Sequence, residues 1–199
     1  MINNIYKTPE AALEVELTTS DEEIVFFPSS NKKLLVLFFS TLGLYCVYWF
    51  YKHWAYQNAR MDKKILPAIR SVFNIFFTHS LFSRISAAAK AKGIRTNIHF
   101  SGLATLYVIA QIASSLIDSA SNKTDYVGLL DYASIAILLV VVYPLYAVQK
   151  VANQINGDPE GELNSQFSVY NYLFIVLGGI FWLFIIAWFL SIDIAQLWD

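Results

Sequence analysis

Residues 169–192 read VYNYLFIVLGGIFWLFIIAWFLSI, a run of apolar and aromatic side chains without a single charge. As an α-helix this run would extend for about 36 Å at 1.5 Å per residue, which is enough to cross the roughly 30 Å hydrocarbon core of a bilayer. Three further runs, 34–51, 100–117 and 127–148, have a similar character. The sequence therefore predicts an all-α membrane protein with a four-helix transmembrane bundle.

The composition agrees with a membrane protein. Hydrophobic residues make up 56% of the 199-residue chain, and its mean hydropathy is +0.47. An ordinary soluble domain is roughly 45–50% apolar. Because one long and two short connections join the four runs, residues 32–199 are predicted to form a single transmembrane domain. The only cysteine, Cys46, excludes an intramolecular disulfide.

Residues 1–31 are predicted to form an acidic and mostly disordered tail, since they are too charged and too poor in apolar side chains to pack alone. The acidic residues before the first run are Glu10, Glu14, Glu16, Asp21, Glu22 and Glu23. Residues 24–27 are an exception, because Ile, Val, Phe and Phe favour an extended backbone and precede Pro28. We expect this short stretch to lie extended against the membrane surface or the bundle.

The distribution of Lys and Arg predicts an orientation for the four spans through the positive-inside rule. The tail, the 118–126 loop and the C-terminus would share one side with Lys7, Lys32, Lys33 and Lys123. The other side would carry Lys52, Arg60, Lys63, Lys64, Arg70, Arg84, Lys90, Lys92, Arg95 and Lys150. The expectation is that the second side is cytoplasmic and that both termini are extracytoplasmic.

The long connection at 52–99 contains two predicted amphipathic helices, 65–77 and 80–92, with a break at 78–80. Each is shorter than the roughly 17 residues that a span needs. We expect a cytoplasmic interfacial hairpin, with aromatic side chains in the acyl boundary and basic side chains toward anionic headgroups. Its candidate contacts to lipid or a partner protein are Arg70, Phe73, Phe76, Phe77, Arg84, Lys90 and Lys92.

Aromatic and basic residues also gather at the end of the first run. Tyr48, Trp49, Tyr51, Lys52 and Trp54 are candidate contacts for a lipid or a peptide. Aromatic side chains beside a basic residue at the end of a span are more often an interfacial belt. The belt is the favoured interpretation, and a recognition patch is the alternative.

Two polar residues within the runs are candidates for function inside the membrane. Asp131 lies near one end of its run, and Gln111 on the neighbouring run is a possible partner. Ionisable groups in spans often mark ion or proton pathways. A hydrogen-bonded or solvated structural aspartate is the more common case so close to the interface, and it is the favoured interpretation.

No motif predicts enzymatic chemistry. His53, His79 and His99 lack cysteine or carboxylate neighbours at metal-binding spacing, and Gly178-Gly179 lies inside a span rather than in a phosphate-binding loop. The sequence therefore predicts a protein that is not an enzyme, without cofactor, metal or nucleic-acid partner.

Several short motifs resemble a family of small uncharacterised bacterial inner-membrane proteins. They are TLGLY at 41–45, YWFYKHW at 48–54, LPAIRSVF at 66–73 and SLF at 80–82. The resemblance covers residues 24–90 and implies a multi-pass location in the bacterial cytoplasmic membrane, with no assigned activity.

Two functions are consistent with these observations. The first is an accessory or interaction protein whose basic amphipathic segment contacts anionic lipid or a partner, with homo-oligomerisation also possible. The second is a small transporter or channel subunit that uses Asp131 and Gln111. The first is favoured, because the sequence shows no internal repeat of the kind common in transporters.

Overall fold

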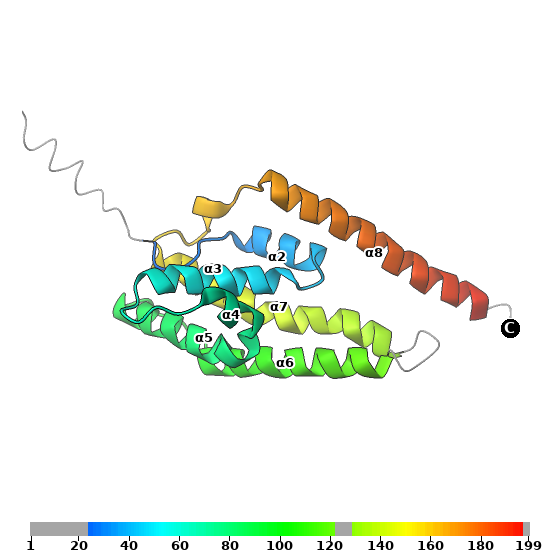
Figure 1. The fold of residues 1–199 in the computed structure, drawn as a ribbon, viewed down its shortest axis with the longest axis horizontal. Helices are drawn as coiled ribbons and strands as arrows, with labels where there is room; N and C mark the ends of the chain where they lie inside the picture. Colours follow the sequence, from blue (N-terminus) through cyan, green and yellow to red (C-terminus); the bar gives the residue numbers. More distant parts are fainter. Residues whose placement is uncertain (1–23, 122–128, 197–199) are drawn as a thin grey trace, which may run out of the picture.

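A computed structural model describes residues 24–121 and 129–196. This part of the chain is all-helical, with seven α-helices, one short 3₁₀ helix and no strand (Figure 1). The helices are α2 (Asn31–Ser40), α3 (Tyr45–Ala59), α4 (Pro67–Val72), α5 (Asn74–Ala91), α6 (Phe100–Ser121), α7 (Leu129–Ile155), η1 (Glu162–Asn164) and α8 (Val169–Gln196).

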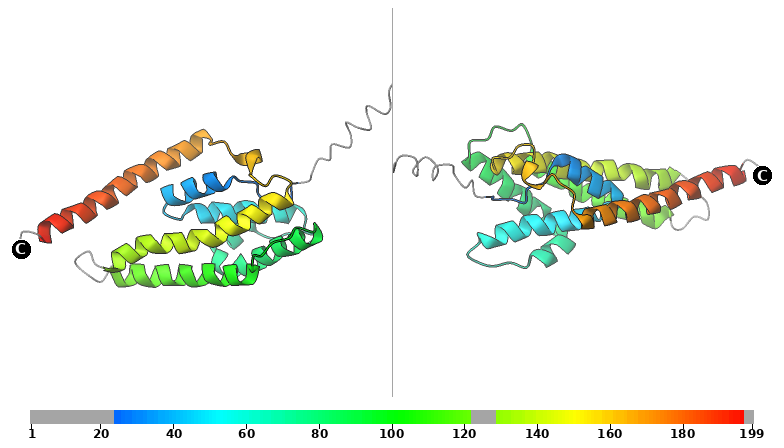
Figure 2. Two further views of the ribbon diagram at one scale, coloured as in Figure 1. Left: turned by 180° about the vertical axis from the view of Figure 1, so that it is seen from behind. Right: turned by 90° about the horizontal axis from the view of Figure 1, so that it is seen from above.

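Three of these helices, α6, α7 and α8, are long and apolar enough to cross a membrane. They cover three of the four predicted runs. Helices α6 and α7 lie side by side as an antiparallel pair (Figures 1 and 2). Helix α8 starts on the far side of α2 and approaches the start of α7 near its own C-terminal end, where the ring centroids of Tyr132 and Phe189 are 4.9 Å apart. Most large side chains of α8 are exposed, as expected for a helix surrounded by lipid. These features indicate a membrane protein.

The continuous helix expected over 34–51 is instead a helical hairpin. Helix α2 ends at Ser40, and the chain reverses through 41–44 before α3 begins, with Leu42 at φ 49° and Gly43 at φ 87°. The Thr41 hydroxyl holds this turn, since it donates to the Leu37 carbonyl (2.8 Å) and accepts the Tyr45 amide (2.9 Å). Hydropathy alone cannot distinguish such a reversal from a straight span.

The two ends of this hairpin lie together. Arg60 Nη2 donates to the Ile24 carbonyl at 2.6 Å, and Gln57 Nε2 donates to the Val25 carbonyl at 3.1 Å. Residues before α2 and after α3 are therefore at the same end of the molecule, and this segment does not pass from one end to the other. A four-helix transmembrane bundle is not confirmed.

Residues 24–30 form an extended segment packed on the helices, which corrects the boundary of the predicted disordered tail. Phe26 and Phe27 are 1% and 4% exposed, so this segment is part of the core. The prediction of an extended stretch is confirmed. It was expected against the membrane surface or against the bundle, and the structure shows it packed against the helices. The remainder of the predicted tail, 1–23, lies outside the described residues.

The predicted hairpin of 65–77 and 80–92 has its break at a different place. Helix α4 ends at Val72, Phe73 (φ −94°, ψ 38°) interrupts the helix, and α5 runs without a break through 78–80. Helix α4 begins at Pro67, where a missing amide donor costs nothing. Helix α5 ends just before Gly93, which adopts φ 67°, as the sequence predicts.

The buried core occupies one end of the molecule. Its largest fully buried side chains come from the extended segment and from α2, α3, α5, α6 and α7, and include Trp49, Trp54, Phe82, Tyr107 and Leu145. The first half of α7 is mostly half-buried or exposed, whereas its second half is mostly buried. The compact end therefore contains α2–α5, and the long helices α6, α7 and α8 extend beyond it (Figure 1).

Candidate functional site

Helix α4 and the first turn of α5 present their apolar side chains outward and their polar side chains inward, whereas from Leu81 on α5 buries its apolar side chains in the core. Ser71, Asn74 and Thr78 are buried, while Phe73 and Phe76 are 53% and 77% exposed. This pattern is the reverse of an amphipathic helix on a soluble domain, whose apolar face covers the core. We call the bend at Phe73, where α4 meets α5, the elbow. Its exposed apolar surface suits contact with hydrocarbon or with another protein.

Hydrogen bonds explain why the inward polar face is stable. Tyr107 Oη donates to Asn74 Oδ1 at 2.8 Å, and Asn74 Nδ2 donates to the Ser71 carbonyl at 2.9 Å. Gln111 Nε2 in turn donates to Tyr107 Oη at 2.9 Å. Since buried polar groups need such partners, this chain of bonds fixes α5 on α6 with Asn74 at the level of Tyr107.

The basic candidates lie along the same helix pair. The Arg70 guanidinium stacks between two aromatic rings, 4.5 Å from the Trp54 ring centroid and 4.9 Å from that of Phe77. Partial burial lowers the pKa of Arg70 from its ordinary value, and repulsion from Arg84 adds to this effect. Lys90 and Lys92 are exposed at the end of α5. The surface thus changes from aromatic to basic along α5.

Phe77 differs from the other two phenylalanines that the sequence predicts as contacts. It is half-buried, packs against the core and supports Arg70. Phe73 and Phe76 remain on the outer surface. The structure therefore brings Arg70, Phe73 and Phe76 to one elbow and assigns Phe77 a mainly structural place.

The aromatic cluster of α3 divides into buried and exposed members. Trp49 and Trp54 are 0% exposed, which corrects the expectation that they form an interfacial belt or contact a ligand. Tyr48 and Tyr51 are exposed at the surface. Lys52 lies over the rings of Phe27 and Tyr48, with its Nζ 5.5 Å and 6.0 Å from their centroids.

A stripe of amides at the end of α7, of which Asn156 directly follows the helix, holds the extended segment 24–30. Asn156 Oδ1 accepts from the amides of Val25 and Phe26 (2.9 and 3.1 Å), and its Nδ2 donates to the Phe26 carbonyl (2.8 Å). Asn153 Nδ2 donates to the Ser29 carbonyl at 2.9 Å. These side chains replace the strand partner that the extended backbone lacks.

Gln149 completes this stripe and joins it to α3. Its Oε1 accepts from Trp49 Nε1 at 2.6 Å and lies 3.2 Å from His53 Nε2, while its Nε2 donates to the Phe27 carbonyl at 3.0 Å. Because indole nitrogen can only donate, Oε1 is the acceptor, and His53 carries its proton on Nε2. Sequence reasoning missed this site, although the spacing of Gln149, Asn153 and Asn156 by four and three residues places them on one helix face.

Asp131 and Gln111 are not brought together. Asp131 Oδ1 accepts from Ser121 Oγ and lines a cavity of about 420 Å³ with Asp118, near the connection between α6 and α7. Gln111 lines a separate cavity of about 230 Å³ that also includes Asn74 and Gly43. The predicted pairing of these two residues is therefore corrected.

Helix α8 is positioned by its contact with the end of α2. Trp182 Nε1 donates to the Phe39 carbonyl at 2.8 Å, and a Cβ added at Gly178 would lie 1.7 Å from the Ser40 carbonyl oxygen. The last carbonyls of α2 have no partner within that helix. Gly178 and the Trp182 indole thus allow α8 to pack closely against the C-terminal end of α2.

Within the described residues, no group of three or more His, Cys, Asp and Glu side chains is arranged to hold a metal ion. Comparisons with protein-family models, with curated protein sequences and with solved structures found no match to this chain. The resemblance to bacterial inner-membrane proteins therefore stays a prediction.

Proposed function

We propose that this chain is an accessory protein of the bacterial inner membrane that uses α4 and α5 to bind anionic lipid at the cytoplasmic surface. The observation that carries the proposal is the reversed amphipathicity of α4 and the first turn of α5. Phe73 and Phe76 face outward where a soluble domain would bury them. The same surface becomes basic toward Lys90 and Lys92, which favours an anionic bilayer over a neutral one.

The position of the elbow along α6 supports insertion into the bilayer. Asn74, two residues before Phe76, is bonded to Tyr107 and so lies at a level seven residues after the start of α6. At 1.5 Å per residue this level is about 10 Å inside the start of that helix. Interfacial helices bury their apolar face to roughly this depth. The exposed phenylalanines would then lie among acyl chains, with the basic end of α5 among headgroups.

Charge supports a cytoplasmic location for this end of the molecule. With α6, α7 and α8 as the only spans, residues 1–99 share one side with the connection between α7 and α8. Twelve of the fourteen Lys and Arg lie in residues 1–99, Lys150 lies near the same end of α7, and only Lys123 lies at the other end. The positive-inside rule then makes the N-terminal side cytoplasmic and the C-terminus extracytoplasmic.

This orientation keeps the basic segment 52–99 in the cytoplasm, as the four-span prediction did. It differs in placing the N-terminal tail in the cytoplasm as well. The earlier expectation of two extracytoplasmic termini required residues 34–51 to cross the membrane. Because the ends of this segment are joined by the Arg60–Ile24 and Gln57–Val25 hydrogen bonds, the tail belongs on the side of the basic segment.

Spin-label accessibility in proteoliposomes tests the insertion. On a Cys46→Ala background, a label at Phe76→Cys should be protected from a water-soluble relaxation agent and exposed to oxygen. A label at Ala91→Cys, near the basic end of the same helix, should show the opposite pattern. Equal exposure of both labels to water would contradict the proposal.

The lipid preference is tested with spin-labelled lipids. Wild-type protein should immobilise labelled phosphatidylglycerol in preference to labelled phosphatidylcholine, and salt should weaken the preference. Replacing Arg84, Lys90 and Lys92 by Gln removes up to about 3 kcal/mol of surface attraction, at about 1 kcal/mol per cation. If the preference survives this change, a protein partner for the basic surface becomes the better hypothesis.

A second candidate function, a small transporter or channel subunit, is favoured by the reversal at Thr41–Leu44. Broken helices line the binding sites of many transporters. Here Gly43 and Gln111 line the same cavity. Proton flux into proteoliposomes, followed with an enclosed pH dye, should then be abolished by Gln111→Leu. Absence of flux in the wild type would contradict this second function.

A further inference from the structure

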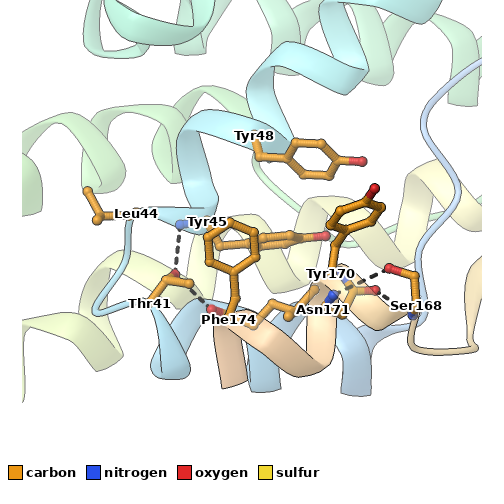
Figure 3. Close-up of a pocket in the computed structure, with 9 residues that line it drawn as sticks. Thr41, Leu44, Tyr45, Tyr48, Ser168, Tyr170, Asn171 and Phe174 are labelled. Atoms are coloured by element: carbon orange, nitrogen blue, oxygen red, sulfur yellow. Dashed lines mark hydrogen bonds between the residues drawn. The ribbon is translucent and has the colours of Figure 1, made fainter. Parts of the chain in front are cut away.

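A groove lies between the α2–α3 hairpin and the start of α8, and it is distinct from the α4–α5 surface. Its volume is about 450 Å³, within the range of roughly 300–1,000 Å³ typical of ligand sites. Figure 3 shows the side chains that line it. They are Leu37, Thr41, Leu44, Tyr45, Tyr48, Ser168, Tyr170, Asn171 and Phe174.

The rim of the groove is open and mostly apolar. Leu44 and Tyr170 are each 75% exposed, and Phe174 is 53% exposed. The next residues along α8 are equally unburied, so the groove opens onto the face of α8 that would adjoin hydrocarbon in a membrane. A groove in this position would be filled by an acyl chain rather than by water, because apolar surface is driven out of water.

One end of the groove presents no unsatisfied polar group. The only polar side chain at this end, Thr41, uses its hydroxyl to donate to the Leu37 carbonyl and to accept the Tyr45 amide. Leu44 and Phe174 lie beside it (Figure 3). This end therefore suits the hydrocarbon part of a ligand.

The other end is polar and adjoins a cation. The hydroxyl groups of Tyr48 and Tyr170 point toward the end where Ser168 lies (Figure 3). Lys52 follows Tyr48 by one helical turn on α3, farther from the reversal, and its Nζ is 6.0 Å from the Tyr48 ring centroid. An anionic group at this end would meet a positive charge and hydroxyl donors together.

We propose that the groove binds one anionic glycerophospholipid of the surrounding leaflet. One acyl chain lies between Leu44 and Phe174, and the phosphate lies at the hydroxyl end beside Lys52. Apolar lining along the groove combined with a cation at one end matches an amphiphile of single negative charge. The inference is independent of lipid binding by α4 and α5, which uses other residues on another face.

Native mass spectrometry of the full chain, released from detergent after mixing with defined lipids, tests the proposal. Wild-type protein should retain one phosphatidylglycerol per chain more strongly than phosphatidylcholine. Lys52→Gln should reduce this preference by about fivefold, which corresponds to the loss of about 1 kcal/mol for one cation. Lys150→Gln is the matched control, because Lys150 is exposed and lies over Tyr146 outside the groove. It should leave the preference unchanged.

A second variant separates occupancy of the groove from charge. Leu44→Trp places a larger side chain at the rim and should remove the retained lipid whatever its headgroup. Leu139→Trp enlarges an equally apolar, exposed side chain on α7 and should leave the retained lipid in place. Retention of phosphatidylglycerol by Leu44→Trp at the wild-type level, or no headgroup preference in the wild type, would overturn the proposal. The triple replacement of Arg84, Lys90 and Lys92 should not affect retention, so failure here is distinguishable from failure of the proposed function.

Discussion

At the scale of single residues, the buried amide of Gln149 links three elements of the core. It accepts from the Trp49 indole and donates to the Phe27 carbonyl and to Asn153 Oδ1. Gln149→Leu would leave several buried polar groups without partners, at about 1–3 kcal/mol each. We expect a loss of about 3 kcal/mol or more in unfolding free energy, seen as a fall of roughly 6–12 °C in the melting temperature.

Gln154→Leu on the same helix is the control for this change. Gln154 is exposed, so its replacement should alter stability by less than about 0.5 kcal/mol. A similar melting temperature for Gln149→Leu and the wild type would show that the amide stripe does not hold the extended segment.

His53 gives the core a pH dependence. Complete burial lowers the pKa of His53 to about 3, although its contact with Gln149 opposes the shift. The unfolded chain, with an ordinary histidine pKa near 6.5, then binds more protons than the folded chain between these values, so stability falls as the pH drops below 6.5. Between pH 7 and pH 5 the loss should be about 2 kcal/mol at 1.36 kcal/mol per pH unit.

Thermal unfolding of His53→Gln between pH 7 and pH 5 checks this expectation. The variant should lack most of the pH dependence of the wild type. His79→Gln, which changes an exposed histidine, should retain it. A wild-type melting temperature that stays constant over this range would contradict a neutral, buried His53.

At the scale of elements, the two adjacent glycines of α8 have different roles. A Cβ at Gly178 would lie 1.7 Å from the Ser40 carbonyl oxygen, whereas nothing lies within 4 Å of a Cβ at Gly179. Gly178→Leu should therefore separate α8 from α2 and destabilise the fold by about 1–3 kcal/mol, the usual cost of overpacking. Gly179→Leu should have little effect. Melting temperatures of the two variants in detergent make the comparison, and equal losses would contradict this packing.

Hydropathy was a reliable guide to the long helices and a poor guide to the hairpin. The runs ending at Ile117, Val148 and Ile192 fall in α6, α7 and α8, because a helix that faces lipid needs apolar side chains all around. The run at 34–51 is just as apolar, yet the chain reverses at Leu42-Gly43, and the indole of Trp49 faces other helices rather than lipid. Composition does not distinguish burial in protein from burial in lipid.

The candidate site was predictable in its residue types and not in its arrangement. The sequence correctly indicated a basic and aromatic helix pair, with Phe73 and Phe76 as surface residues. It could not show that Asn74 would face inward, since this depends on Tyr107 from a helix 33 residues away along the chain. Distant polar pairs of this kind leave no periodic signal in the sequence.

At the scale of the whole molecule, the hairpin determines on which side the N-terminus lies. If residues 34–51 do not cross, Ser20 should be cytoplasmic, together with α5. On a Cys46→Ala background, Ser20→Cys and Ala91→Cys should react with a membrane-impermeant thiol reagent only after permeabilisation. Thr124→Cys, in the connection between α6 and α7, should react in intact cells. Ala91 is expected to be cytoplasmic and Thr124 extracytoplasmic whether the chain has three or four spans. Only the labelling of Ser20→Cys therefore discriminates between the two topologies. Labelling of Ser20→Cys in intact cells would restore the fourth span and contradict the joined ends of the hairpin.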